Sequence, residues 1–183
     1  MRKFSNSLVF VTTLLLTGNS YAAHVMVGGQ AMFPSQDIVT NAANSADHST
    51  LVAALKAAGL VDTFKGKGPY TVFAPTNAAF AKLPAGTVAT LLKPENKKAL
   101  VQLLSYHVVA GTFDFDMLAS KIARDGGKTT LVTLAGGKLA FAMNGKHNMT
   151  ITDDSGSVAN ISIYDVYQSN GVINVIDSVL MPQ

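Results

Sequence analysis

The chain has 183 residues, of which 48% are hydrophobic and 14% are charged, so it can fill one folded core and is too apolar for a disordered protein. It contains no cysteine, which excludes disulfide bonds, cysteine-ligated metal sites and thiol nucleophiles. Its formal net charge of +3 is far below the dense positive charge typical of nucleic-acid-binding proteins.

The N-terminus has the pattern of a secretion signal. Arg2 and Lys3 give a positive start, an apolar stretch follows at residues 8–16, and Ser20 and Ala22 put small side chains where signal peptidase requires them. The apolar stretch is about half of the roughly 20 residues that a membrane-spanning helix needs. We therefore expect a signal peptide over residues 1–22 and an exported protein, periplasmic or extracellular, that does not insert into the membrane.

The first half of the mature chain is predicted to be mainly helical. Residues 23–36 contain glycines and a proline without a clear hydrophobic period, so we expect a flexible lead-in there. Apolar side chains then recur at helical spacing, with capping residues and glycines at the ends of the runs. The expected helical segments run from Asp37 to Gly59, from Pro94 onwards, and from about Asp114 to Gly126.

The second half changes to a period of two, which is typical of half-buried strands. Pairs that suit tight turns lie between the apolar runs, for example Asn144-Gly145. Val158 is out of phase with Ile161 and Ile163, which indicates a bulge or a change of face. The expected strands are Tyr70–Ala74, Leu139–Met143, Met149–Ile151, Val158–Tyr164 and Val172–Leu180. Helices first and an antiparallel meander afterwards indicate an α+β domain.

Three segments of the chain resemble the signatures of one known family. YTVFAPTNAAF at residues 70–80 and NGVINVIDSVL at 170–180 resemble the two signatures of the fasciclin domain, and YHVVAG at 106–111 matches its Tyr–His segment. The resemblance covers a single domain over residues 37–182. It implies a β-wedge or sandwich of antiparallel strands, with helices packed from the N-terminal half. The implied role is adhesion, or interaction with proteins or glycans, and not catalysis.

The resemblance also suggests candidate interaction residues. In animal members of the family the Tyr–His pair is implicated in receptor binding, and here it is Tyr106 and His107. His107 continues the apolar stripe of the preceding helix, so a buried histidine with paired ring nitrogens is the favoured interpretation. An Asp–Ile adhesion element of those relatives matches Asp165 and Val166. We expect Asp165 to be a solvated turn residue beside a strand end.

Catalytic and metal sites find no support in the sequence. His107 stands in no nucleophile motif, and the other histidines are scattered without a pair four residues apart. Asp153–Gly156 fits a polar hairpin turn better than a calcium loop, and Lys65–Gly68 is too short to cradle a phosphate. We therefore expect a protein that is not an enzyme and that holds no metal or cofactor.

Two functions remain open. The first is a secreted or periplasmic module that binds envelope or extracellular proteins or glycans through its surface, which would need a contiguous exposed patch. The alternative is a carrier or sensor that holds a small apolar ligand between the helices and the sheet. That alternative needs an enclosed apolar pocket of at least roughly 300 Å³.

The expected cleavage site can be tested directly. If Ser20-Tyr21-Ala22 is read by signal peptidase, intact-mass measurement of the exported protein will show a chain that starts at Ala23. A membrane-bound form that retains Met1 would contradict both the export and the solubility expected of the mature chain.

Overall fold

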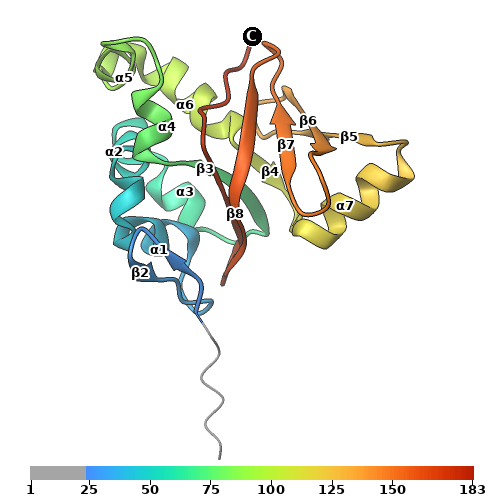
Figure 1. Ribbon diagram of the computed structural model, residues 1–183. Coiled ribbons are helices and arrows are strands. Elements are labelled where there is room, and N and C mark those ends of the chain that lie inside the picture. The colour runs from blue at the N-terminus through green and yellow to red at the C-terminus, as the bar shows by residue number, and fades with distance from the viewer. Residues whose placement is uncertain (1–23) are drawn as a thin grey trace, which may run out of the picture.

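The computed structural model describes residues 24–183; the expected signal peptide and its cleavage site lie outside the described residues. Figure 1 shows most of the helices on one side of a twisted sheet and a single helix, α7, on the other. Within residues 24–183, none of the helices has the length and apolar character needed to cross a bilayer. The α-helices are α1 (Ile38–Asn44), α2 (Ser49–Ala58), α3 (Val61–Lys65), α4 (Asn77–Ala81), α5 (Thr87–Leu91), α6 (Lys97–Tyr106) and α7 (Phe115–Arg124). The strands are β1 (Met26–Val27), β2 (Gln30–Ala31), β3 (Tyr70–Pro75), β4 (Val108–Ala110), β5 (Lys128–Val132), β6 (Lys138–Met143), β7 (Met149–Thr152), β8 (Val158–Gln168) and β9 (Gly171–Ile176).

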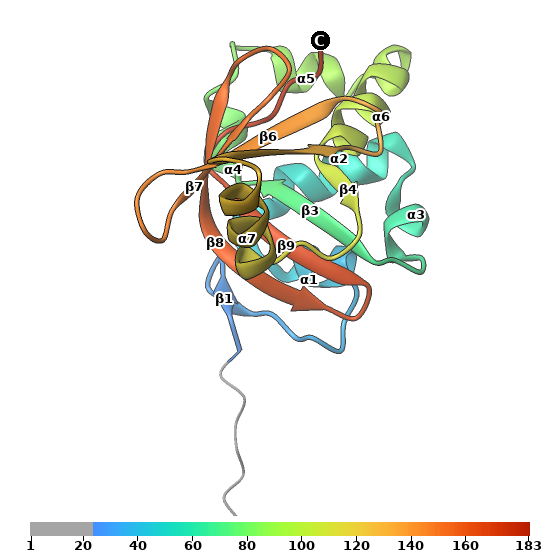
Figure 2. The ribbon, with the colours of Figure 1, turned by 90° about the vertical axis from the view of Figure 1, so that its right-hand side faces the viewer.

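The main sheet has seven strands in the order β4-β3-β9-β8-β7-β6-β5. β5 to β9 pair antiparallel in chain order, but β9 also runs parallel to β3, with Tyr70 opposite Gly171. At the far ends, Val109 bridges to Thr133, so β4 meets the chain just after β5 and the sheet is nearly closed. Figure 2 shows β3 and β9 crossing the middle of the molecule behind α7.

Helix ends are fixed by the capping residues that the sequence indicates. Asp37, Thr76 and Asp114 precede α1, α4 and α7, and each accepts a hydrogen bond from the third backbone amide of its helix. Gly59 ends α2 in the left-handed conformation. α2 has no cap of its own at its N-terminus; instead Asn77 Oδ1 accepts a hydrogen bond from the Thr50 amide at 2.9 Å. The start of α4 therefore caps α2 from another segment of the chain.

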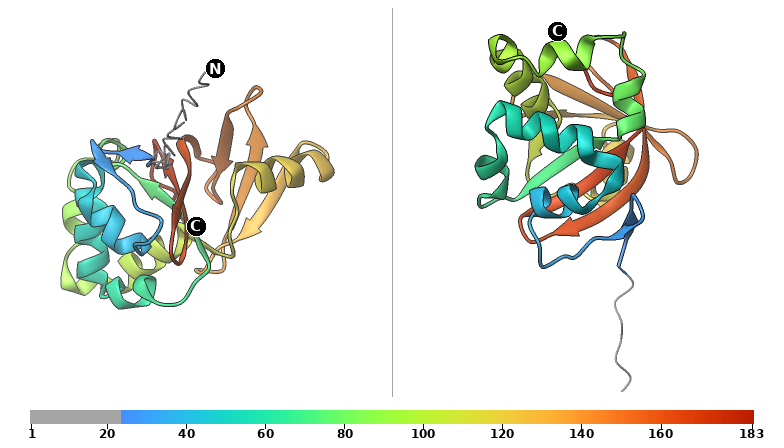
Figure 3. Two further views of the ribbon diagram at one scale, coloured as in Figure 1. Left: turned by 90° about the horizontal axis from the view of Figure 1, so that it is seen from below. Right: turned by 90° about the vertical axis from the view of Figure 1, so that its left-hand side faces the viewer.

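Side chains on the two faces of the sheet enter two separate cores. Val72 and Ile173 point into the core under helices α1–α6, whereas Phe73 and Ile176 point into the core beneath α7. Figure 3 shows the cyan-to-green helices covering the first face, with α7 on the opposite side of the sheet. The two central strands thus serve both cores, because each has an apolar side chain on either face.

Two expectations about the fold need correction. Residues 24–36 are not a flexible lead-in, because Met26–Val27 and Gln30–Ala31 pair as a β-hairpin and Val27 and Met32 are buried. The sheet is not purely antiparallel, since β3 and β9 are parallel. The bulge expected in the Val158–Tyr164 strand is confirmed: β8 has register shifts between Ile161 and Ile163 and between Ile163 and Val166.

Asn170 and Gly171 join the helical layer to the start of the central strand pair. The Asn170 carboxamide accepts a hydrogen bond from the Ile38 amide at 3.0 Å and donates to the carbonyl oxygens of Phe64 and Gly66 at 2.8 and 3.0 Å. Gly171 has φ +156°, and a Cβ there would overlap the Tyr70 carbonyl oxygen. Only glycine lets the two parallel strands approach this closely.

We predict that Gly171→Ala lowers the free energy of unfolding by about 3 kcal/mol or more, because backbone strain and a backbone clash add together. Gly145 is the matched control: its φ is +89° and nothing lies within 4 Å of a Cβ built there. Gly145→Ala should cost only about 1 kcal/mol. Urea denaturation of both variants measures the difference, and equal losses would contradict the close approach.

Candidate functional site

The Tyr106–His107 pair is buried at the end of α6. Tyr106 is 0% exposed, and its hydroxyl donates to the Lys138 carbonyl oxygen and accepts from the Asp154 amide, both at 2.8 Å. Burial, with the nearby carboxylates, raises the pKa of Tyr106 to about 12, so the phenol stays protonated. Tyr106 therefore ties α6 to the β7–β8 turn, and its side chain has no free surface for a partner.

His107 joins two distant parts of the chain. Its Nδ1 lies 2.8 Å from the Leu103 carbonyl oxygen, and its Nε2 accepts from the Leu180 amide at 3.0 Å. An Nε2 that accepts must carry no proton, so the ring is the neutral tautomer with Nδ1 donating. Burial lowers the pKa of His107 to about 4. The geometry agrees with the favoured interpretation of a buried histidine with paired nitrogens.

Asp165 is not the solvated turn residue that the sequence suggests. It lies at a bulge within β8 with φ +58°, half-buried. Its Oδ1 accepts from the Phe115 amide at 2.8 Å, and its own amide donates to Asn174 Oδ1 at 3.1 Å. Burial, together with the Asp114 and Asp116 carboxylates, raises the pKa of Asp165. The aspartate therefore positions the start of α7, and the neighbouring Val166, 1% exposed, packs in the core under the helices.

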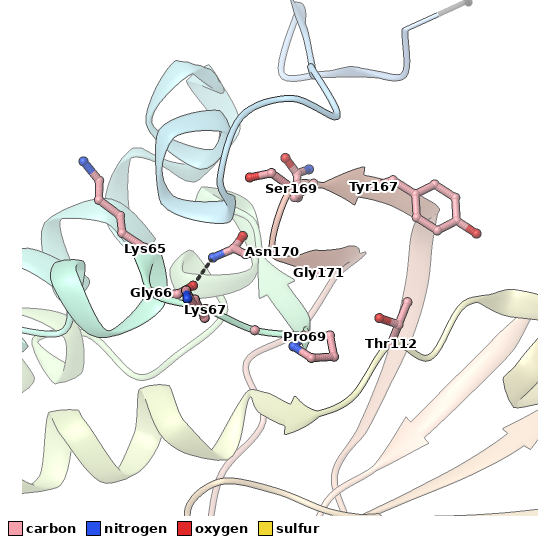
Figure 4. A pocket seen from close by; sticks show the side chains of 11 residues that line it. Lys65, Gly66, Lys67, Pro69, Thr112, Tyr167, Ser169, Asn170 and Gly171 are labelled. Carbon is pink, nitrogen blue, oxygen red and sulfur yellow. Dashed lines mark hydrogen bonds between the residues drawn. The ribbon is translucent and has the colours of Figure 1, made fainter.

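An open groove of about 530 Å³ lies where the loop after α3 meets the β8–β9 turn. In Figure 4, Lys65 and Lys67 lie at one end, Tyr167 lies at the other, and Pro69 and Thr112 lie between them. Asn170 and Gly171 form the part of the wall that ties the groove to the central strands. The groove is thus assembled from the end of α3 and the loop that follows it, the segment after β4 and the β8–β9 hairpin, which are far apart in the sequence.

Several polar groups in this groove are not used by the fold. The Lys67 ammonium and the hydroxyls of Thr112 and Ser169 have no hydrogen-bond or ion-pair partner among the described residues. The Asn170 carboxamide, by contrast, is already hydrogen-bonded within the chain, to the Ile38 amide and the Phe64 carbonyl oxygen. Unpaired donors in a concave, open surface can bind an external ligand without breaking an internal contact.

Tyr167 forms the aromatic end of the groove and is 46% exposed. Its hydroxyl donates to Asp114 Oδ2 at 3.1 Å. Desolvation and the carboxylates of Asp114, Asp165 and Asp116 raise the pKa of Tyr167 to about 12. The ring is therefore held by one end and presents a neutral, flat face to the solvent.

Two cavities between the helices and the sheet in the described residues are too small for the alternative function. Two apolar cavities between the helices and the sheet have volumes of about 20 and 10 Å³. Either would hold about one water molecule, and small-molecule pockets measure roughly 300–1,000 Å³. These cavities do not favour a carrier or sensor of an apolar ligand.

Metal-ligating residues do not cluster in the part of the chain that the structure covers: residues 24–183 hold no group of three or more His, Asp or Glu side chains arranged for an ion. Asp153 shows how the carboxylates are used instead. Its Oδ1 accepts from Ser155 Oγ and the Ser157 amide, and its Oδ2 accepts from the Met181 amide at 2.9 Å. The polar turn expected at Asp153–Gly156 is therefore closed by its own side chain.

The sequence did not single out the groove as a site. In sequence, Lys65–Gly68 resembles only a phosphate loop that is too short, and neither Tyr167 nor Thr112 belongs to a recognisable motif. The sequence-predicted candidates that lie nearest to the groove in the chain are Asp165 and Val166, which directly precede Tyr167. Only the folded arrangement brings the lysines and the tyrosine to one surface.

Comparison with known proteins identifies relatives over most of the chain. The profile described as "Fasciclin domain" matches residues 46–182. "Protein sll1483" of Synechocystis is 44% identical over 158 residues, which cover 86% of this chain and 79% of that protein. "Cell surface glycolipoprotein MPB83" of Mycobacterium bovis is 39% identical over 161 residues, covering 85% of this chain and 64% of the relative.

A solved structure shares the fold. It is described as a FAS1 domain pair from the insect cell adhesion molecule Fasciclin I, with a TM-score of 0.70 and 18% sequence identity. The match covers 81% of this chain and 51% of that chain, so this chain spans about half of the insect pair. The α+β class and the family resemblance read from the sequence are confirmed.

The buried His107 predicts a pH dependence of stability. The unfolded chain binds a proton near pH 6.5 but the folded chain only near pH 4, so stability is lost as the pH falls through this range. Between pH 7 and pH 4.5 we expect the free energy of unfolding to fall by about 2–3 kcal/mol on account of His107. Urea denaturation at both pH values measures the loss.

His107→Ala should be less stable at pH 7 and should lose most of this pH dependence, with a smaller part left because burial also lowers the pKa of His48. His147, exposed in the β6–β7 loop, is the matched control, and His147→Ala should keep the dependence of the parent. An unchanged dependence in His107→Ala would show that the histidine is not held neutral.

Proposed function

The chain belongs to the fasciclin domain family, and from this premise we propose that it is an exported, non-catalytic module that binds protein or glycan partners at the cell envelope. Fasciclin domains serve in cell adhesion and in cell-surface proteins. Support for the envelope comes from the signal-like N-terminus and from relatives described as a cell surface glycolipoprotein and as part of a cell adhesion molecule.

The observation that carries the proposal is the contrast between the groove and the interior. The groove of about 530 Å³ is open and includes three polar side chains without a described partner, whereas the two cavities under the helices hold only about 20 and 10 Å³. The space available to a partner therefore lies in the groove rather than in these two cavities. We propose the groove as the contact surface for the partner.

The candidate residues taken from the family then have supporting roles. Tyr106, His107 and Val166 are at most 3% exposed, so a partner could reach them only after the fold opens. Asp165 acts through the start of α7 and through the charge it places near Tyr167. We propose that this segment shapes the end of the groove rather than contacting the partner itself.

Capture from envelope extracts tests this function. The immobilised mature protein should retain one or more envelope components, identified by mass spectrometry. A groove variant with Lys67→Glu and Tyr167→Ala should lose them, because it changes the charge at one end and removes the flat ring at the other. Both side chains are exposed, so the free energy of unfolding of the variant should lie within about 1 kcal/mol of that of the parent.

The matched control carries Lys128→Glu and Val132→Ala on β5, where both residues are also exposed. It should capture the same components as the parent. If the control loses them, or if the groove variant keeps them, binding does not pass through the groove.

A further inference from the structure

The groups that line the groove have a mixed chemistry. Lys67, Ser169 and Thr112 supply a cation and two hydroxyls that nothing in the described chain occupies. Tyr167 and Pro69 supply exposed flat faces at the other end and along the floor. Donors that alternate with flat apolar faces match a sugar ring, which carries hydroxyls around its edge and C–H groups on its faces.

The strands beside the groove argue against an extended peptide. A peptide that adds to a sheet needs an unpaired strand edge, and a peptide held by its side chains needs apolar pockets. β3 is paired on both sides, with β4 and β9, and β9 is paired with β3 and β8. The strand ends that reach the groove therefore offer no free edge.

Charge is distributed unequally along the groove. Lys65 and Lys67 stand at one end, and neither lies within 4 Å of a described carboxylate, although Lys65 interacts electrostatically with Asp37 at longer range. At the other end the Tyr167 hydroxyl donates to Asp114 Oδ2 at 3.1 Å, and desolvation together with the carboxylates of Asp114, Asp165 and Asp116 raises the pKa of Tyr167 to about 12. An anionic group is attracted to the lysine end and repelled from the tyrosine end, which gives the ligand a direction.

We propose that this groove binds an acidic saccharide, with a ring carboxylate beside Lys67 and a neutral sugar ring against Tyr167. The proposal rests on the function proposed above, since it names the class of ligand for the same surface. The hydroxyls of Thr112 and Ser169 lie between the two ends and bind the ring hydroxyls. A volume of about 530 Å³ lies within the range of small-ligand sites, so a short oligosaccharide segment fits.

The probe is a disaccharide of one uronate ring linked to one neutral hexose, titrated into the ¹⁵N-labelled mature protein and followed by NMR. Amide shifts should concentrate at residues 65–68, 112 and 167–171. The methyl ester of the same disaccharide keeps the shape and removes the charge, and it should bind about 3- to 10-fold more weakly. Raising the salt concentration should weaken the binding of the acidic disaccharide but not the binding of the ester.

Variants separate the two ends of the groove. Lys65→Gln combined with Lys67→Gln should lower the affinity for the acidic disaccharide about 3- to 10-fold and leave the affinity for the ester unchanged. The equal charge change at Lys128→Gln combined with Lys138→Gln, outside the groove, should have no effect. Tyr167→Ala should lower the affinity for both ligands several-fold. Tyr167→Phe keeps the flat face, so its affinity for both ligands should stay within about twofold of that of the parent.

The proposal is overturned if the acid and the ester bind equally, if the shifts map elsewhere, or if both lysine pairs have the same effect. A glutamate-rich hexapeptide that binds more tightly than the disaccharide would also overturn it, in favour of an acidic peptide. If the groove still captures envelope components while the disaccharide causes no shifts, only the ligand class is wrong. If capture is independent of the groove, the proposed function itself fails.

Discussion

The parallel pairing of β3 with β9 is the constraint on which the rest of the structure depends. These two strands lie inside the sheet, and each puts apolar side chains into both cores, such as Val72 and Phe73 from β3. Their ladder begins at Tyr70 and Gly171, where the backbones meet so closely that a Cβ does not fit. Beside that contact the Asn170 carboxamide holds α1 and the end of α3. One point of the chain thus sets the strand register and the position of the helices.

Local interactions account for several of the helix ends. Asp114 and Thr76 cap the helices that follow them, and Gly59 ends α2, because each effect involves neighbours within a few residues. The parallel pairing joins segments about a hundred residues apart and leaves no periodic trace in either strand. The order in residues 24–36 cannot be predicted locally for a related reason: their hairpin is short, and Val27 and Met32 become buried only against the rest of the fold.

In the candidate site, too, the features set by neighbouring residues could be predicted, and those set by distant residues could not. His107 was correctly expected to be buried, since it continues a stripe of leucines on its own helix. Its second partner, the Leu180 amide, is 73 residues away and could not be anticipated. Asp165 was expected in solvent because it lies beside a turn in sequence, yet its positive φ at the bulge directs its carboxylate to the Phe115 amide. A bulge can be suspected from broken alternation, but the direction of its side chains depends on the neighbouring elements.

The same contacts explain why the groove can carry specificity without weakening the fold. The wall at Asn170 and Gly171 cannot change, because these residues set the central strand pair and hold the helices. Lys67, Thr112 and Ser169 end in groups that no described residue binds, so their replacement removes no internal hydrogen bond of the side chain. The Tyr167 side chain contributes one hydrogen bond, to Asp114, and the residue is 46% exposed. A rigid wall therefore presents a set of replaceable side chains, and the ligand proposed for this groove would change with surface substitutions alone, which usually alter stability by about 0.5 kcal/mol or less.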